Sequence, residues 1–375
     1  MSNDRRMTVL RAVVEDYIRT QEPVGSSALA KRHGLSVSSA TVRNDMAALE
    51  DEGYLIQPYT SAGRIPTEKG YRFFVNRLAS AAYLSEPQRL AVKEFLSGSV
   101  NLDDALRRAS KLLAQITGQV AVVTSPSLAR SALRRLEIVP LNIDSCLAVV
   151  ITDTGRVEQR TVINAYPIDF SQLAFVAGTI NSQCMSMNLS DVSAFIEKLD
   201  IPVSQTGYDC PVNALANIFR DIASRERTDS FYVSGTSHLA HCESMNHDDM
   251  TSLFDALEEQ IVIMRLMNSL SGVSSEENVS KSDVGVAIGS ETNNPALKNA
   301  SFVSGGYGSE NQTGKEGVPL AFVGSVGPTH MDYATTIASV RVVASYLSRY
   351  IAAERNPHFQ YRSITSRKED IPLTG

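Results

Sequence analysis

The first 80 residues constrain this chain most, because they read as three short helices followed by a turn-rich hairpin. Residues 4–20 carry apolar side chains at helical spacing, which predicts an amphipathic first helix. A shorter helix is predicted over residues 27–33, with Ser26 as its N-cap. A third helix is predicted from Ser38, another good N-cap residue, to residue 52, just before a glycine that suits a helix end.

The predicted third helix has two chemically different faces. Its apolar residues lie three or four positions apart and must point into the core: Val42, Met46 and Leu49. The opposite face combines small residues with an amide and a guanidinium: Ala40, Arg43, Asn44 and Ala47. Arginine suits guanine or a phosphate, and asparagine suits adenine. Acidic residues 50–52 stand at the far end, so the N-terminal half is the part predicted to enter a DNA groove.

The hairpin after this helix completes the order of a winged helix-turn-helix. Residues 54–57 read as a strand, residues 58–63 as turns, and residues 64–66 as the returning strand. The tip offers hydroxyls, a glycine and a cation that suit a phosphate backbone or a minor groove: Thr60, Ser61, Gly63 and Arg64. A protein-interaction domain with the same elements is the alternative, and the pattern alone leaves both open.

Charge is distributed unevenly along the 375 residues. The formal net charge is -6, yet residues 1–80 hold 11 Lys and Arg against nine Asp and Glu. A mildly basic head on an acidic body fits a DNA-binding module attached to a sensing or dimerising body. Hydrophobic residues make up 43% of the chain, which is enough for a sizeable core.

Targeting, metal and catalytic signals are weak. No apolar run approaches the length of a membrane span, and the first 11 residues lack an apolar signal-peptide core, so we expect a cytosolic protein. The four cysteines are far apart, which favours buried or incidental thiols over disulfides. A His and Cys cluster lies within ten residues but matches no standard metal spacing: His238, His241, Cys242 and His247. We therefore expect no metal, no cofactor and no enzyme activity.

The part of the chain after residue 80 is predicted to contain both strands and helices. Strands are predicted at residues 120–123, 136–141, 147–152, 157–163, 284–288, 301–303 and 321–323, and helices at 102–116, 170–187, 213–224, 248–267 and 333–350. Residues 81–102 read as a linker with one helix, and residues 356–375 as a flexible tail. The apolar stripe within 248–267 suits either core or a dimer interface. The Gly- and Ser-rich residues 304–317 read as an inserted loop.

Several long strings resemble the HrcA family of heat-inducible transcription repressors. In the head they are EPVGS at 22–26, SATVRNDM at 39–46, LE at 49–50, GYL at 53–55, QPYTSAGRIPT at 57–67 and GYR at 70–72. In the body they are GPTHMDY at 327–333 and, more weakly, GTS at 235–237 and LEE at 257–259. Family members usually carry His where this chain has Tyr59 and Arg where it has His330. We expect the first departure to affect the wing, and the second only a body contact far from the head.

The resemblance implies a dimeric repressor that binds an inverted-repeat operator upstream of chaperone operons, is modulated by the chaperonin and is released on heat stress. It implies an α+β fold: a winged helix-turn-helix at 1–80, a GAF-like domain at 103–189 and 281–355, and an inserted, mainly helical dimerisation domain at 190–280. A small-molecule-responsive regulator with the same GAF-like body is the alternative function. Pattern and resemblance together give the candidate DNA contacts: Ser26, Ser38, Ser39, Ala40, Thr41, Arg43, Asn44, Thr60, Ser61, Gly63 and Arg64.

Overall fold

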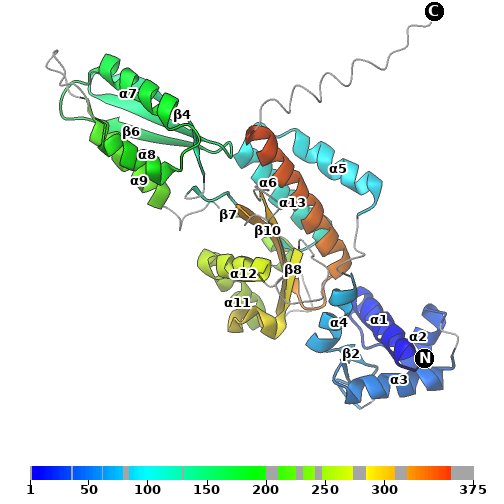
Figure 1. Ribbon diagram of the computed structural model, residues 1–375. Coiled ribbons are helices and arrows are strands. Elements are labelled where there is room, and N and C mark those ends of the chain that lie inside the picture. Colours follow the sequence, from blue (N-terminus) through cyan, green and yellow to red (C-terminus); the bar gives the residue numbers. More distant parts are fainter. Residues whose placement is uncertain are drawn as a thin grey trace, which may run out of the picture.

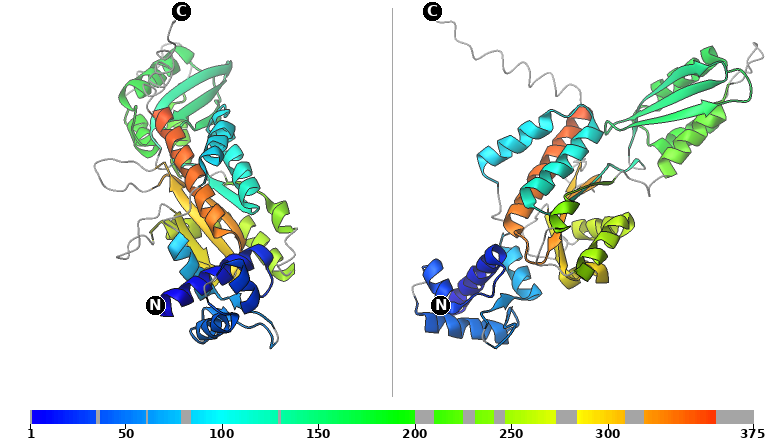
Figure 2. Two further views of the ribbon diagram at one scale, coloured as in Figure 1. Left: turned by 90° about the vertical axis from the view of Figure 1, so that its right-hand side faces the viewer. Right: turned by 180° about the vertical axis from the view of Figure 1, so that it is seen from behind.

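A computed structural model describes residues 2–34, 37–60, 62–78, 84–128, 131–199, 210–224, 231–240, 247–272, 284–308 and 319–355. The chain has three parts, shown in Figure 1: a helical head, a central body built on a five-stranded sheet, and a smaller unit built on a second sheet. The head and the smaller unit lie at opposite ends of the body in all three views (Figures 1 and 2). The mixture of helices and antiparallel sheets confirms the predicted α+β class.

The head contains the helices and hairpin in the predicted order. Its elements are α1 (Ser2–Thr20), α2 (Ser26–Arg32), α3 (Ser39–Asp51), β1 (Leu55–Ile56), β2 (Ile65–Pro66) and α4 (Glu68–Leu78). Strands β1 and β2 pair antiparallel and form the stem of the wing. The helices share a core because their apolar positions repeat at helical spacing: Leu10, Val13, Leu29, Val42 and Leu49 are fully buried.

The two predicted N-caps have different outcomes. Ser38 caps α3 as expected, since its Oγ accepts a hydrogen bond from the backbone N–H of Thr41 at 3.2 Å. The prediction for Ser26 is wrong, because α2 begins one residue earlier, with Gly25 at its N-cap. The Gly25 carbonyl accepts the first helical bond from the Leu29 N–H at 3.0 Å, so Ser26 becomes the first helical residue and is buried.

The body is organised around a five-stranded antiparallel sheet in the order β7-β3-β10-β9-β8. Its strands are β3 (Val120–Thr124), β7 (Phe231–Ser234), β8 (Val284–Ile288), β9 (Ala300–Tyr307) and β10 (Ala321–Pro328). Side chains alternate between the faces, as along β3, where Val123 packs into one core and Val122 into another. Each face of the sheet is therefore covered by its own layer of helices.

Helices α6 (Leu102–Thr117) and α13 (Tyr333–Arg355) cover one face, and α5 (Glu86–Ser97) packs against both of them. Helices α11 (His247–Glu258) and α12 (Gln260–Gly272) cover the other face, with the short helix α10 (Thr236–Ala240) following β7. Two 3-10 turns, η3 (Gly289–Thr292) and η4 (Pro295–Leu297), connect β8 to β9. The helix layers of the two faces are visible in Figure 2.

Three body predictions need correction. The single helix predicted over 248–267 is two helices, because the chain turns at Glu259, whose carbonyl accepts from the Val262 N–H at 2.8 Å. Most of its apolar stripe is core, although Ile261 stays 56% exposed. Residues 304–307, predicted to open a loop, continue β9 through pairing with β10, and residues 309–318 lie outside the described part. Strand β7 was not predicted.

The second sheet belongs to a unit whose bounds differ from the domain bounds expected from the sequence. Among the described strands, β4 (Leu133–Asn142), β5 (Ser145–Thr152) and β6 (Val157–Ile163) pair only with one another, in that order. They share one core with α7 (Phe170–Gln183), α8 (Leu189–Glu197) and α9 (Val212–Ser224). The separate unit therefore spans 133–224, whereas the expected insertion was 190–280. Apolar alternation predicts a strand but does not identify the sheet it joins.

Candidate nucleic-acid interface

Helix α3 presents the polar face that its sequence predicts. Val42 and Leu49 are fully buried and Met46 is 3% exposed, so the opposite side of the helix faces solvent. That side exposes Ser38, Ser39, Ala40, Arg43, Asn44 and Ala47, and Thr41 is half-buried beside the cap. Arg43 and Asn44 have no hydrogen-bond or ion-pair partner among the described residues. Their guanidinium and amide groups are thus available to an outside partner.

An ion pair between a half-exposed arginine and a buried carboxylate fixes α3 against α1. The Arg5 guanidinium donates to both carboxylate oxygens of Asp45, at 2.7 and 3.0 Å, and Asp45 is only 5% exposed. Such bidentate pairs specify geometry as well as adding energy. Sequence reasoning missed this contact, although Asp45 lies next to the apolar face of its helix. A carboxylate next to an apolar face needs a cation beside it, so the position of Asp45 in the sequence could have predicted an ion pair.

A second buried carboxylate ties α1 to α2. Asp16 is 1% exposed and accepts from Arg19 at 2.6 Å and from Arg32 at 2.9 Å, with the His33 Nε2 at 3.2 Å. Removing one partner of a buried charged group is costly, so this network holds the helices in one arrangement. The Asp16 network therefore fixes α2 on α1, and the Arg5–Asp45 pair fixes α3 on the same helix.

The wing tip is closed by one glutamine. The Gln57 side-chain amide donates to the carbonyls of Thr60 and Ala62, each at 3.0 Å, and the Ala62 N–H donates to the Tyr59 carbonyl at 2.9 Å. Tyr59 and Thr60 are exposed beyond this turn, while Ser61 lies outside the described residues. The tip thus offers a hydroxyl and a phenol to solvent.

Gly63 has a structural role that differs from the predicted one. We expected it to allow close approach to DNA, yet a Cβ at this position would overlap the carbonyl of Val24. Val24 and Arg64 form a backbone bridge, with two hydrogen bonds of 2.9 Å. Packing of the wing against residues 23–24 therefore requires the glycine, because any side chain would separate these backbones.

Arg64 is held within the head. Its Nε lies 2.7 Å from the Oε2 of Glu50, and its side chain is 19% exposed. The other Glu50 oxygen accepts from the Gln57 N–H at 3.1 Å, so this acid joins the end of α3 to the wing. The acidic end of α3, expected only to stay clear of phosphates, thus neutralises a predicted contact residue. Arg43 is the more exposed of the two cations.

Polar contacts hold α4 of the head to the body. The Arg72 guanidinium donates to the Glu291 carboxylate at 2.7 Å and to the Val286 carbonyl at 2.7 Å. Glu68 accepts from the backbone N–H of Ser290 at 3.2 Å and also from its hydroxyl. These contacts join α4 to β8 and η3, so the head is positioned by the main sheet.

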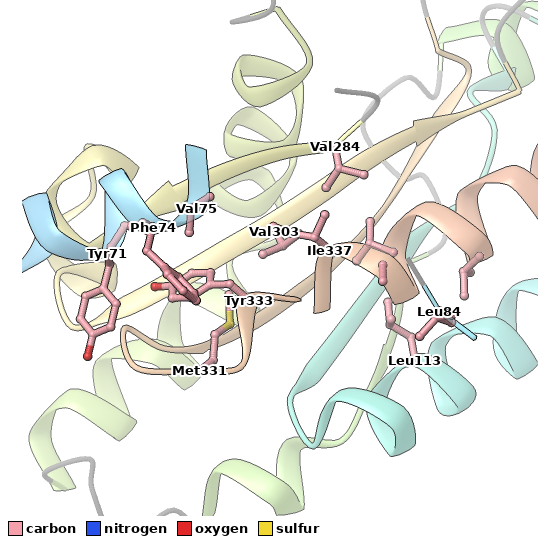
Figure 3. Packing of buried hydrophobic residues seen from close by; sticks show 14 of the residues in the cluster. Tyr71, Phe74, Val75, Leu84, Leu113, Val284, Val303, Met331, Tyr333 and Ile337 are labelled. Carbon is pink, nitrogen blue, oxygen red and sulfur yellow. The ribbon is translucent and has the colours of Figure 1, made fainter. Parts of the chain in front are cut away.

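Apolar and aromatic contacts complete the same junction. Tyr71 and Tyr333 have ring centroids 5.9 Å apart, and Figure 3 shows Tyr71 and Phe74 of α4 beside Met331 and Tyr333. The His330 ring stands edge-on to Tyr17 of α1, with centroids 6.3 Å apart, and burial lowers the pKa of this histidine. The expectation that His330 lies far from the head is therefore wrong. Chain folding brings the 327–333 string to α1 and α4.

The remaining predicted groups lie apart from this interface. Cys146 and Cys184 are free thiols buried in the core of the second unit, and burial raises the pKa of both. His241 and Cys242 lie outside the described residues, and inside them no group of three or more His, Cys, Asp or Glu is arranged to hold a metal. None of the described helices is both long and apolar enough to cross a membrane.

Comparisons with known proteins agree with the resemblance seen in the sequence. Residues 103–337 match the family described as HrcA protein C terminal domain. The chain is 51% identical over 376 residues to the heat-inducible transcription repressor HrcA of Bifidobacterium longum subsp. infantis, covering 95% of this chain and 99% of that protein. It is 53% identical to the protein of the same name from Bifidobacterium adolescentis, covering 94% and 98%.

A solved structure shares the fold. It is described as the crystal structure of a hypothetical protein at 2.2 Å resolution, with a TM-score of 0.64 and 23% identity over 94% of this chain and 99% of that chain. This likeness supports the arrangement of elements and nothing about activity. The family match and the near-complete relatives establish that the chain belongs to the HrcA family of heat-inducible transcription repressors.

Proposed function

We propose that this chain represses heat-shock genes by placing α3 in the major groove of an operator, with the wing against the adjacent backbone. The observation that carries the proposal is the exposed face of α3, where Arg43 and Asn44 have no partner among the described residues. The ion pair between Arg5 and Asp45 beneath that face holds it in place. A rigid helix with a free guanidinium and a free amide suits direct base readout.

The second unit supplies a surface for pairing two copies. Strand register places Val139, Leu147 and Thr161 side by side on the face of the second sheet that the described helices leave open. The same face exposes 45% of Val139, 49% of Val157 and 78% of Ile163. Exposed apolar residues grouped on one face favour a protein partner. We infer that a second copy covers this face, since a two-fold dimer matches an inverted-repeat operator.

The domain roles follow from the same reasoning. We infer that residues 2–78 act as the winged helix-turn-helix, that the five-stranded body is the GAF-like domain, and that residues 133–224 are the inserted dimerisation unit. Control by the chaperonin and release on heat stress come from the family resemblance, and they complete the proposal. No catalytic step, metal or cofactor is needed for this activity.

Operator binding by two alanine variants tests the proposal. Arg43→Ala and Asn44→Ala should each cost about 1–3 kcal/mol of specific binding and relax base preference, because each removes a contact to a base edge. Footprinting and titration on a chaperone-operon promoter would measure this. Lys111→Ala, on the exposed side of α6, is the matched control and should bind like the parent. Parent-like binding by both test variants would contradict the assignment of α3.

Arg64→Ala separates two roles of the wing. If Arg64 also reaches a phosphate, the variant binds all sequences more weakly and shows a flatter salt dependence. If its role is the internal pair with Glu50, the salt slope stays that of the parent and thermal stability falls instead. Titrations at several salt concentrations, run beside a melting curve, distinguish these results.

A further inference from the structure

A cleft of about 390 Å³ lies between α5 and α13, on the side of the body away from α11 and α12. Its walls are mainly apolar: Leu84, Leu90 and Val92 come from the α5 side, and Val342 and Tyr346 from α13. Leu90 is 59% exposed, so part of this apolar wall is in contact with solvent. A volume in this range is typical of sites for small organic ligands.

The rim of the cleft is strongly basic. Arg89 and Lys93 project from α5, and Arg341 and Arg349 from α13, against one acid, Glu86. Arg89 and Lys93 are both exposed, and within the described part of the chain no carboxylate forms an ion pair with either of them. This local excess of cations stands out in a chain whose formal net charge is -6. An apolar cleft with a cationic rim is complementary to a molecule with an apolar body and an anionic end.

DNA is not the partner that this position favours. Helix α3 lies at the outer side of the head, whereas α5 lies beside α13 on the body, as Figures 1 and 2 both show. The cleft is also bounded by two helices and lined by apolar side chains, while a DNA backbone site needs mainly polar donors. The chemistry therefore points to a small amphiphile.

We infer that the cleft between α5 and α13 is a binding site for a single-chain anionic amphiphile, such as an unbranched long-chain carboxylate. The chain lies between the helices, where Val92 and Val342 face it, and the carboxylate meets Arg89 and Lys93. This site is independent of the operator-binding proposal, because it uses none of the α3 or wing residues.

Binding of dodecanoate to the full-length protein tests the site. Isothermal titration should show saturable binding by the parent, and dodecanol, with the same tail and no charge, should bind at least about tenfold more weakly. The double variant Arg89→Glu with Lys93→Glu should lose about tenfold or more in dodecanoate affinity, which corresponds to about 1.4 kcal/mol. Ser345→Phe, at an exposed lining position, should also weaken binding by filling the cleft.

A charge-matched control is Lys111→Glu with Arg265→Glu, two exposed cations on α6 and α12 outside the cleft. It should bind dodecanoate like the parent. Equal binding by the parent, the cleft variant and the control would overturn the proposal, as would no binding by the parent. Two further results would also overturn it: loss of operator affinity by the cleft variant without ligand, or sedimentation of the parent with anionic lipid vesicles. These would assign the cations to DNA or to a membrane surface.

Discussion

The outward face of α3 and the open face of the second sheet differ in chemistry although both are exposed. On α3 the exposed residues are small or hydrogen-bonding, with Arg43 and Asn44 at the centre. On the second sheet they include Val139, Val157 and Ile163. A polar face gains little by excluding water, whereas an apolar face gains about 25 cal/mol for each Å² it buries. The two faces therefore fit the two different partners proposed for them, DNA and a second copy of the chain.

The supports beneath these faces differ as well. The ion pair of Arg5 with the buried Asp45 lies beneath α3, whereas under the second sheet lies an apolar core that includes Cys146, Ala148 and Val150. Ion pairs with fixed geometry orient a helix for base readout. A sheet needs only a continuous surface to pair with a copy of itself. Substitutions can therefore alter one face while leaving the other intact.

The largest effect is expected from charging the open sheet face. Val139→Glu combined with Ile163→Glu would place four carboxylates in the interface of a dimer. The dissociation constant of the dimer should rise by about 100-fold or more, because buried, unpaired charge is costly. Sedimentation at micromolar concentration should show monomer, and operator affinity should fall with it. Lys198→Glu changes the charge by the same total amount at the exposed C-cap of α8, and this variant should remain dimeric. A variant that stays dimeric would place the interface elsewhere.

A smaller effect is expected from adding one methyl group to the wing. Gly63→Ala should cost about 1–3 kcal/mol of stability, because its Cβ overlaps the Val24 carbonyl and must separate the wing from residues 23–24. Operator binding should weaken while the dimer persists. Gly178→Ala is the matched control, since a Cβ there meets no atom within 4 Å and the residue lies inside helix α7. Equal melting temperatures for the two variants would argue against the packing role of Gly63.

The head was the part that sequence reasoning predicted best. Helical spacing placed Val42, Met46 and Leu49 inside, and the structure buries all three. Local rules worked there because caps and turns involve neighbouring residues, as Ser38 and Gly53 show. Ser26 was misassigned because the start of α2 depends on which residue leaves helical geometry first, and Ser26 and Gly25 both qualify by residue type.

The spacing of residue types along the sequence does not predict contacts between residues that lie far apart in the chain. The strands between residues 133 and 163 were predicted, but not that they form a sheet separate from the one that contains β3. Alternation of apolar and polar residues predicts a strand and does not specify its partner strands. The contact between His330 and Tyr17 joins residues more than 300 positions apart. Arg64 was assigned to DNA from its place at the wing, and only the folded chain reveals Glu50 beside it.

The junction between head and body gives the smallest predicted effect, a dependence on pH. Burial lowers the pKa of His330 below its usual value near 6.5, so the folded protein binds a proton there less readily than the unfolded chain. The stability contributed by neutral His330 is therefore complete above the unfolded pKa and is lost as the pH falls through the folded pKa. The ring faces Tyr17 of α1, so protonation should loosen the head while leaving the open sheet face unchanged.

Chemical denaturation of the parent and of His330→Gln at pH 7.5 and 5.5 measures this effect. The parent should lose more stability on acidification than the variant, since glutamine does not titrate and the other groups are common to both proteins. The dimer should persist at both pH values, because none of the open-face residues named above is a histidine. The same loss in both proteins would show that the pKa of His330 is the same in the folded and the unfolded protein, and the pH response would then belong to other groups.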